Sequence, residues 1–126
     1  MDGKKIFGLV LTIALALFFI VPNGLGKTFG LLGTDINELA ETFGYSAGFM
    51  QLIGGLELLG GVGLLLPQTR KLAALGLIGL MLGAIVTHIR MPATIGMLPM
   101  PILTAAALFL VIKFGGAQAA AAPAGD

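Results

Sequence analysis

Four long apolar segments, separated by short polar ones, restrict the folds that this chain can adopt. They cover residues 6–22, 47–66, 72–88 and 95–112. Each is close to the roughly 17–25 apolar residues that cross a bilayer as a helix. Only 10 per cent of the residues are charged, whereas about 25 per cent are charged in a soluble domain. We therefore expect an all-α, multi-pass membrane protein, with an antiparallel four-helix transmembrane bundle as a single domain over residues 1–113.

The first apolar segment has a second interpretation. Lys4 and Lys5 precede it and the glycine-rich residues 24–26 follow it, a pattern that also occurs in cleavable signal peptides. Its length and the three apolar segments after it favour a retained span. At the other end of the chain, residues 114–126 are rich in Ala, Gly and Pro, so we expect a disordered tail there.

Several classes of chemistry are excluded by composition. The chain contains no cysteine, which excludes disulfides, iron–sulfur ligation and thiolate zinc sites. It also shows no nucleotide-binding loop, cluster of metal ligands or nucleophile triad. We therefore expect no metal site, no covalently attached cofactor, no nucleic-acid partner and no autonomous enzyme. Any redox chemistry must come from a bound molecule or from a partner subunit.

The distribution of lysine and arginine predicts the orientation in the membrane. One set of segment ends carries most of these residues: Lys4, Lys5, Arg70, Lys71 and Lys113. The other set carries only Lys27 and Arg90. Because positive residues favour the cytoplasmic side, we expect the chain in the inner (plasma) membrane, with both termini in the cytoplasm. Residues 23–45 then form an outward-facing loop.

A short helix is expected inside this loop. Asp35 and Glu38 have the spacing of a capping box, and Gly44 supplies a C-terminal stop. Between them, apolar residues recur at helical spacing: Ile36, Leu39, Ala40 and Phe43. This pattern predicts an amphipathic helix that lies in the membrane interface like a lid. An ordinary surface helix is the alternative.

Glu57 is the most unusual residue of the apolar segments. A carboxylate near the centre of a span costs several kcal/mol, so we expect a functional or a packing role for it. Gly54 and Gly61 share its helix face, and such stripes let helices approach closely. Glu57 should therefore point toward the bundle. On the third segment a second stripe contains Gly76, Gly79, Gly83, Thr87 and Arg90.

Candidate partners for Glu57 gather toward the outer half of the membrane. They are Asn23 and Lys27 after the first segment, Gln51 on the second, and Thr87, His88 and Arg90 at the end of the third. Glu57 lies about 15 Å along its helix from Ala47. A long cationic side chain must then reach inward, or a water or ligand must bridge the gap. His88 projects about 100° from the Gly83 stripe, and a single histidine at a span end is more often interfacial than functional.

These residues also carry a resemblance to a known family. Residues 56–67 (LELLGGVGLLLP) and 70–90 (RKLAALGLIGLMLGAIVTHIR) resemble the DoxX and DoxX-like family of small four-helix membrane proteins. Residues 23–27 (NGLGK) look like the glycine–lysine motif of that family, and the similarity covers residues 6–112. It implies association with quinone-linked oxidoreductase complexes, with oxidative-stress assemblies or, in distant relatives, with assembly of other membrane proteins. Such an analogy indicates the architecture better than the activity.

Three functions are consistent with this sequence. In the first, the protein is a small subunit or accessory factor of a quinone-linked membrane redox complex and binds a quinone or lipid-like ligand near Glu57. This function requires a buried acid that faces a cavity open to lipid. In the second, it is an assembly factor or scaffold that docks other membrane subunits or a second copy, with a packed interior. A small-molecule transporter ranks last, because the second segment has no polar residue beyond Gly61.

Overall fold

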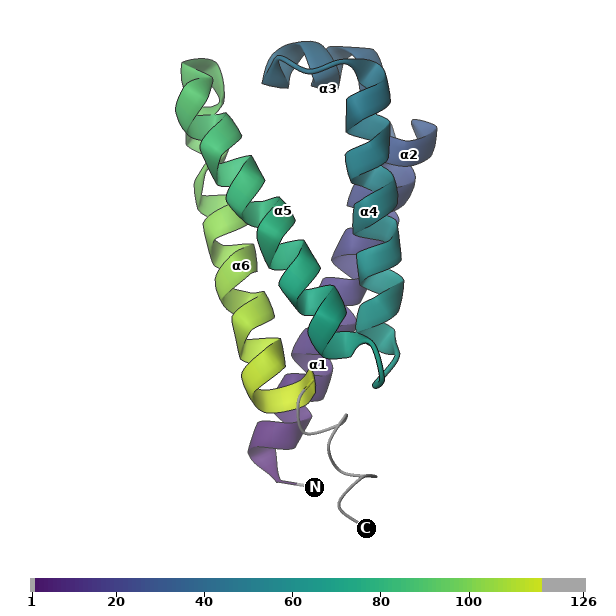
Figure 1. Ribbon diagram of the computed structural model, residues 1–126, viewed down its shortest axis with the longest axis vertical. Coiled ribbons are helices and arrows are strands. Elements are labelled where there is room, and N and C mark those ends of the chain that lie inside the picture. The colour runs from purple at the N-terminus through teal and green to yellow at the C-terminus, as the bar shows by residue number, and fades with distance from the viewer. Residues whose placement is uncertain (1, 117–126) are drawn as a thin grey trace.

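The computed structural model describes residues 2–116, which are helical with no strand among them. The α-helices are α1 (Gly3–Phe18), α2 (Gly26–Phe29), α3 (Ile36–Phe43), α4 (Ala47–Leu65), α5 (Arg70–Arg90) and α6 (Pro99–Val111). Wider or tighter helical segments are η1 (Phe19–Leu25, π), η2 (Pro92–Met97, 3-10) and η3 (Ile112–Gly116, π). Figure 1 shows α1, α4, α5 and α6 as long columns, with α3 lying across one end. The expected all-α class is confirmed.

The first helix continues past Pro22, where the sequence predicted its end. Proline has no N–H, so in an α-helix the carbonyl oxygen of Phe18 loses its donor. Here η1 widens the turn, and Asn23 Nδ2 donates to that oxygen at 3.0 Å. The helix therefore runs from α1 through η1 to α2 and ends at Gly30, whose φ is +68°. The prediction that a loop begins at residue 23 was wrong.

The expected helix in the loop is present as α3. Asp35 Oδ1 accepts a hydrogen bond from the backbone N–H of Glu38 at 3.1 Å, which caps the start of the helix. Gly44, with a φ of +77°, ends it in a left-handed conformation. Glycine adopts this conformation without strain, and the chain then turns directly into α4.

The predicted second and third segments match α4 and α5 within two residues at each end. Arg70 stabilises the connection between them, because its Nε donates to the Leu64 carbonyl at 2.6 Å, one of the carbonyls left open at a helix end. The fourth helix differs more. Its expected first residues form η2, and its path continues through η3 to Gly116, beyond the expected start of the tail. The rest of that tail, residues 117–126, lies outside the described residues.

Within residues 2–116, three helical stretches are long and apolar enough to cross a membrane: Gly3–Phe29, Ala47–Leu65 and Arg70–Arg90. Pro99–Phe114 is a shorter apolar helix. Large apolar side chains point away from the protein interior along these helices, among them Leu59, Leu72 and Leu103, each more than 60 per cent exposed. Extensive exposed apolar surface is typical of a membrane-contacting protein.

The apolar core lies toward the end of the molecule that contains the α4–α5 turn. It contains Leu15, Ala16, Phe19, Leu64, Ala74, Leu77, Met81, Leu108 and Val111. At the opposite end α4 and α5 diverge, and α3 lies above the gap between their ribbons (Figure 1). The packed core therefore fixes the helices at one end, while the cavities described below lie at the other.

Glycines on α4 let the first helix approach closely. A Cβ added to Gly54 would lie 2.5 Å from Lys27 Cβ, and one added to Gly61 would lie 2.7 Å from Ile20 Cγ1. Both contacts are shorter than two carbon atoms can tolerate. The packing role predicted for the Gly54 and Gly61 stripe is therefore confirmed.

The matching expectation for α5 was wrong. An added Cβ at Gly76, Gly79 or Gly83 would meet nothing within 4 Å. The buried face of α5 instead carries larger side chains, including Leu77 and Met81. Leu77 packs against Gly60 of α4, where an added Cβ would lie 2.5 Å from Leu77 Cδ2. At this contact the small residue therefore belongs to α4 and the large one to α5.

Candidate functional site

Lys27 and Glu57 form a direct ion pair, with 2.7 Å between Lys27 Nζ and Glu57 Oε1. The Glu57 side chain is 1 per cent exposed and that of Lys27 is 19 per cent exposed. Glu57 belongs to the buried face of α4 together with Gly54. Because Gly54 has no side chain, Lys27 passes beside it and reaches the carboxylate one helical turn further along α4. Glu57 thus points into the protein, as predicted, and no water or ligand bridge is needed.

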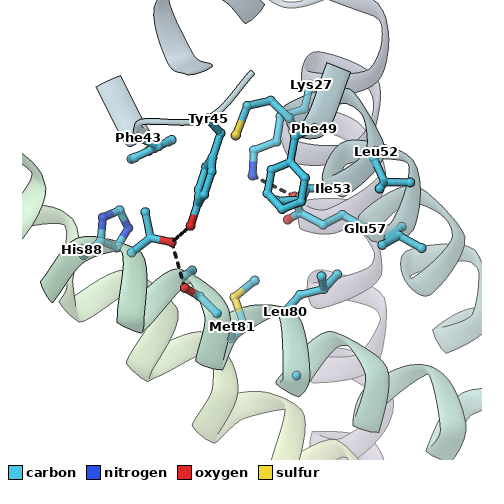
Figure 2. Close-up of a pocket in the computed structure, with 16 residues that line it drawn as sticks. Lys27, Phe43, Tyr45, Phe49, Leu52, Ile53, Glu57, Leu80, Met81 and His88 are labelled. Carbon is cyan, nitrogen blue, oxygen red and sulfur yellow. Dashed lines mark hydrogen bonds and ion pairs between the residues drawn. The ribbon is translucent and has the colours of Figure 1, made fainter. Parts of the chain in front are cut away.

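The ion pair lies on the wall of a cavity of about 290 Å³ between α4 and α5. Figure 2 shows this cavity with Lys27, Glu57 and Tyr45 around it. Most of the wall is apolar or aromatic: Phe43, Phe49, Met50, Leu52, Ile53, Leu56, Gly79, Leu80, Met81, Gly83 and Ala84. The polar groups are Lys27, Tyr45, Glu57, Thr87 and His88. Apolar walls with a few convergent polar groups are typical of a site for a small molecule.

A second cavity of about 240 Å³ lies between the first helix, α3, α5 and α6. The two cavities share six lining residues: Lys27, Phe43, Glu57, Met81, Ala84 and His88. The ion pair and the imidazole therefore border both cavities. A ligand in either one has access to the same three polar side chains.

His88 is buried, although a single histidine at a span end was expected to be interfacial. It is 7 per cent exposed, and its Nδ1 lies 3.0 Å from Thr94 Oγ1. Its ring packs against Phe43 in a T-shaped arrangement, with 5.3 Å between the ring centroids. The imidazole is thus held in place by η2 on one side and α3 on the other.

Thr87 is also buried, and it contacts a residue that sequence reasoning missed. Its Oγ1 lies 2.6 Å from the Tyr45 hydroxyl and 2.9 Å from the Gly83 carbonyl oxygen. The single hydroxyl hydrogen of Thr87 goes to the carbonyl, so Tyr45 donates to Thr87. Figure 2 shows this contact from Tyr45 toward α5. Tyr45 is the only tyrosine of the chain and directly follows the Gly44 stop. These two features of the sequence could have marked it as a site residue.

Three predicted site residues take other positions. Gln51 is exposed, lines neither large cavity, and donates to the Thr28 carbonyl oxygen at 3.2 Å. Arg90 is exposed, lines neither large cavity, and borders a separate pocket of about 50 Å³. Asn23 borders the second cavity, but its side-chain amide is bonded to the backbone of η1. The structure therefore brings Glu57, Lys27, Thr87 and His88 together and leaves Gln51 and Arg90 outside.

The chemistry of this arrangement is the binding of a mainly apolar molecule with a small polar head. Lys27 supplies hydrogen-bond donors, while Glu57 and the hydroxyls of Tyr45 and Thr87 supply acceptor oxygens. These groups lie within apolar walls where hydrogen bonds are stronger than in water. The exposed side chains of Leu52 and Leu56 belong to the same wall, so the cavity reaches the outer surface of the helices.

Comparison with known proteins identifies the family. No curated protein and no solved structure matches this chain. A family model described as the DoxX-like family matches residues 10–111. The match runs from α1 to the end of α6 and includes Lys27, Glu57, Thr87 and His88. Because it covers most of the chain and agrees with the apolar helices, the protein is a membrane protein that belongs to the DoxX-like family.

Proposed function

We propose that this protein is a small subunit or accessory factor of a quinone-linked membrane redox complex and binds a quinone, or a similar lipid-soluble ring compound, beside Lys27 and Glu57. The observation that carries the proposal is a buried ion pair on the shared wall of two largely apolar cavities. A buried pair that served packing alone would not need open space on both sides. The protein acts within a complex rather than as an autonomous enzyme.

The cavity walls also support entry of the ligand from the lipid. Leu52 is 57 per cent exposed and Leu56 is 43 per cent exposed, and both line the larger cavity. Their outer surfaces face the region that lipid chains occupy in our proposal. A hydrophobic ligand then enters sideways between α4 and α5, with its head group directed to Lys27 and its tail left in the bilayer.

The proposed membrane arrangement is an antiparallel bundle of four spans in the inner membrane, with both termini in the cytoplasm. The first helix is retained, in agreement with its contribution of Leu15, Ala16 and Phe19 to the core. The fourth span is the shorter helix Pro99–Phe114, extended by its neighbouring helical turns. In this arrangement α3 lies in the outer interface and covers the cavities.

An assembly or scaffold role is the second candidate, and other membrane subunits or a second copy would be its partners. It is favoured by the close contact between the first helix and α4, where Gly54 and Gly61 leave no room for side chains. In that role the ion pair would only join two helices. A transporter is less well supported, because the interior beyond Gly61 is lined by the apolar residues of the core.

A neutral double variant separates ligand binding from scaffolding. Lys27→Met combined with Glu57→Gln removes both charges, so neither partner is left as an unpaired buried charge. The purified proteins in mild detergent are analysed for copurifying quinone and partner subunits, with Gln51→Ala as a control outside the cavities. We expect the double variant to accumulate normally but to lose the quinone. Full retention of quinone by the double variant would overturn the ligand-binding proposal. A wild-type protein that copurifies with partner subunits but with no quinone would favour the scaffold.

A further inference from the structure

The hydrogen bonds around His88 give its two ring nitrogens different roles. Nδ1 lies 3.0 Å from Thr94 Oγ1, and the same Oγ1 lies 2.8 Å from the Met91 carbonyl oxygen. A threonine hydroxyl has one hydrogen, and a carbonyl oxygen can only accept. Thr94 therefore donates to Met91 and accepts from His88. It follows that Nδ1 carries the ring hydrogen.

The second nitrogen, Nε2, is then an acceptor, because a neutral imidazole has one donor and one acceptor nitrogen. Within residues 2–116 no hydrogen bond reaches Nε2. Nε2 is not among the fully buried unpaired atoms there, so part of its surface is accessible. His88 is 7 per cent exposed and borders both cavities. A donor on a molecule bound in either cavity can therefore reach this acceptor, and the apolar walls make such a hydrogen bond stronger than in water.

Lys27 offers the complementary chemistry on the same walls. Its ammonium group has three hydrogens and no acceptor, and one hydrogen is directed to Glu57. The others are available to an oxygen atom of a ligand. The aromatic rings of Phe43, Tyr45 and Phe49 border the larger cavity, and flat rings pack well against such walls. The site therefore matches a ring compound that both donates and accepts.

We propose that the site prefers the hydroxylated form of its ligand, an alkyl-substituted phenol or hydroquinone, over the corresponding quinone. A ring hydroxyl donates to His88 Nε2, and Lys27 donates to a ring oxygen. This inference rests on the proposed function, and it adds the oxidation state that the cavity selects. Thr94 is a positioning residue in this scheme, since it determines which ring nitrogen accepts.

Three probes with the same tail test the preference: decylhydroquinone, its dimethyl ether and decylbenzoquinone. Their affinities for the purified full-length protein are measured by equilibrium dialysis in one detergent, with the hydroquinone kept reduced. Loss of one hydrogen bond between ligand and protein in this apolar cavity corresponds to about tenfold in affinity. We therefore expect the hydroquinone to bind about tenfold more tightly than either of the other two probes. Equal affinities would overturn the inference and leave the proposed function intact, whereas absence of binding by all three would overturn both.

Variants of His88 and Thr94 locate the effect. His88→Phe keeps a flat ring and removes the acceptor, so hydroquinone affinity should fall about tenfold while quinone affinity stays unchanged. Thr94→Val leaves the imidazole in place and frees Nδ1, which should reduce the preference even where His88→Phe folds poorly. Arg90→Gln, outside both cavities, is the matched control and should bind all probes as the wild type does. If both His88→Phe and Thr94→Val still preferred the hydroquinone over the quinone, the role of Nε2 as the acceptor would be contradicted.

Discussion

The Tyr45 hydroxyl lies 2.6 Å from Thr87 Oγ1 and joins the connection just before α4 to the last turns of α5. These two helices pack closely near their connecting turn and diverge toward the other end (Figure 1). Tyr45 therefore links the start of the α4 arm to α5 where the two helices are far apart. Since both residues line the larger cavity, the bond also helps to set the width of that cavity.

Tyr45→Phe tests this bridge with a change of one oxygen atom. We expect a loss of about 1 kcal/mol in the free energy of unfolding, the usual effect of one net hydrogen bond. Dissociation of a bound quinone should become faster, because the two helices lose a contact across the cavity. Thermal unfolding in detergent and ligand dissociation kinetics measure the two effects. Thr42→Val, which removes an exposed hydroxyl of α3 bonded only to its own helix, should change neither.

The Lys27–Glu57 pair should show strong coupling between its two members. Lys27→Met leaves a carboxylate that is 1 per cent exposed without its cation, and breaking a buried pair in this way costs about 3–5 kcal/mol. Glu57→Gln should cause a smaller loss of stability, because Lys27 is partly exposed and its long side chain can turn its ammonium group toward solvent. The double variant should be close to the wild type in stability. Additive losses in this double-mutant cycle, measured by thermal unfolding, would show that the two residues act independently.

Gly54 and Gly55 form a matched pair on different faces of α4, about 100° apart. Gly54→Ala places a methyl group against Lys27 Cβ and the backbone nitrogen of Thr28, so we expect a loss of about 1–3 kcal/mol. It should also weaken ligand binding, since Lys27 must move away from Glu57. Gly55→Ala meets nothing within 4 Å and should be neutral or slightly stabilising. Equal effects of the two substitutions on stability in detergent would contradict the close packing of the first helix on α4.

The proposed orientation is tested by single cysteines in a chain that has none. Glu41, exposed on α3, and Gln68, exposed in the α4–α5 turn, are suitable positions. With both termini in the cytoplasm, Glu41→Cys should react with a membrane-impermeant maleimide in intact cells. Gln68→Cys should react only after lysis. The reverse pattern would invert the orientation and place α3 on the cytoplasmic side.

The lengths of α4 and α5 and the existence of α3 followed from local patterns. Apolar segments of spanning length predicted the two long helices, and the spacing of Asp35, Glu38 and Gly44 predicted the short one. The continuation of the first helix was missed, because proline normally ends a helix. Here the side chain of Asn23 replaces the missing backbone donor. That replacement depends on a widened turn, which residue periodicity does not reveal.

The site was predicted only in part for a related reason. Glu57 was recognisable because its charge is unusual in an apolar segment. Lys27 was recognisable because it is the cation of the motif at residues 23–27, directly after the first apolar segment. Gln51 and Arg90 were placed on the correct helices but face outward. Their position near the same membrane surface does not determine which helix face is buried. Tyr45 was missed because its direction depends on the tight corner at Gly44.

The widened turn of η1 has a consequence for the direction of Lys27. An α-helix rotates by about 100° for each residue, and a π turn holds one residue more than an α turn. If the seven residues of Phe19–Leu25 formed regular α-helical turns instead, Lys27 would be turned away from Glu57 by about that angle. No side chain of the pair would have to change. The angular phase of one helix is thus as necessary to this site as the charges that meet in it.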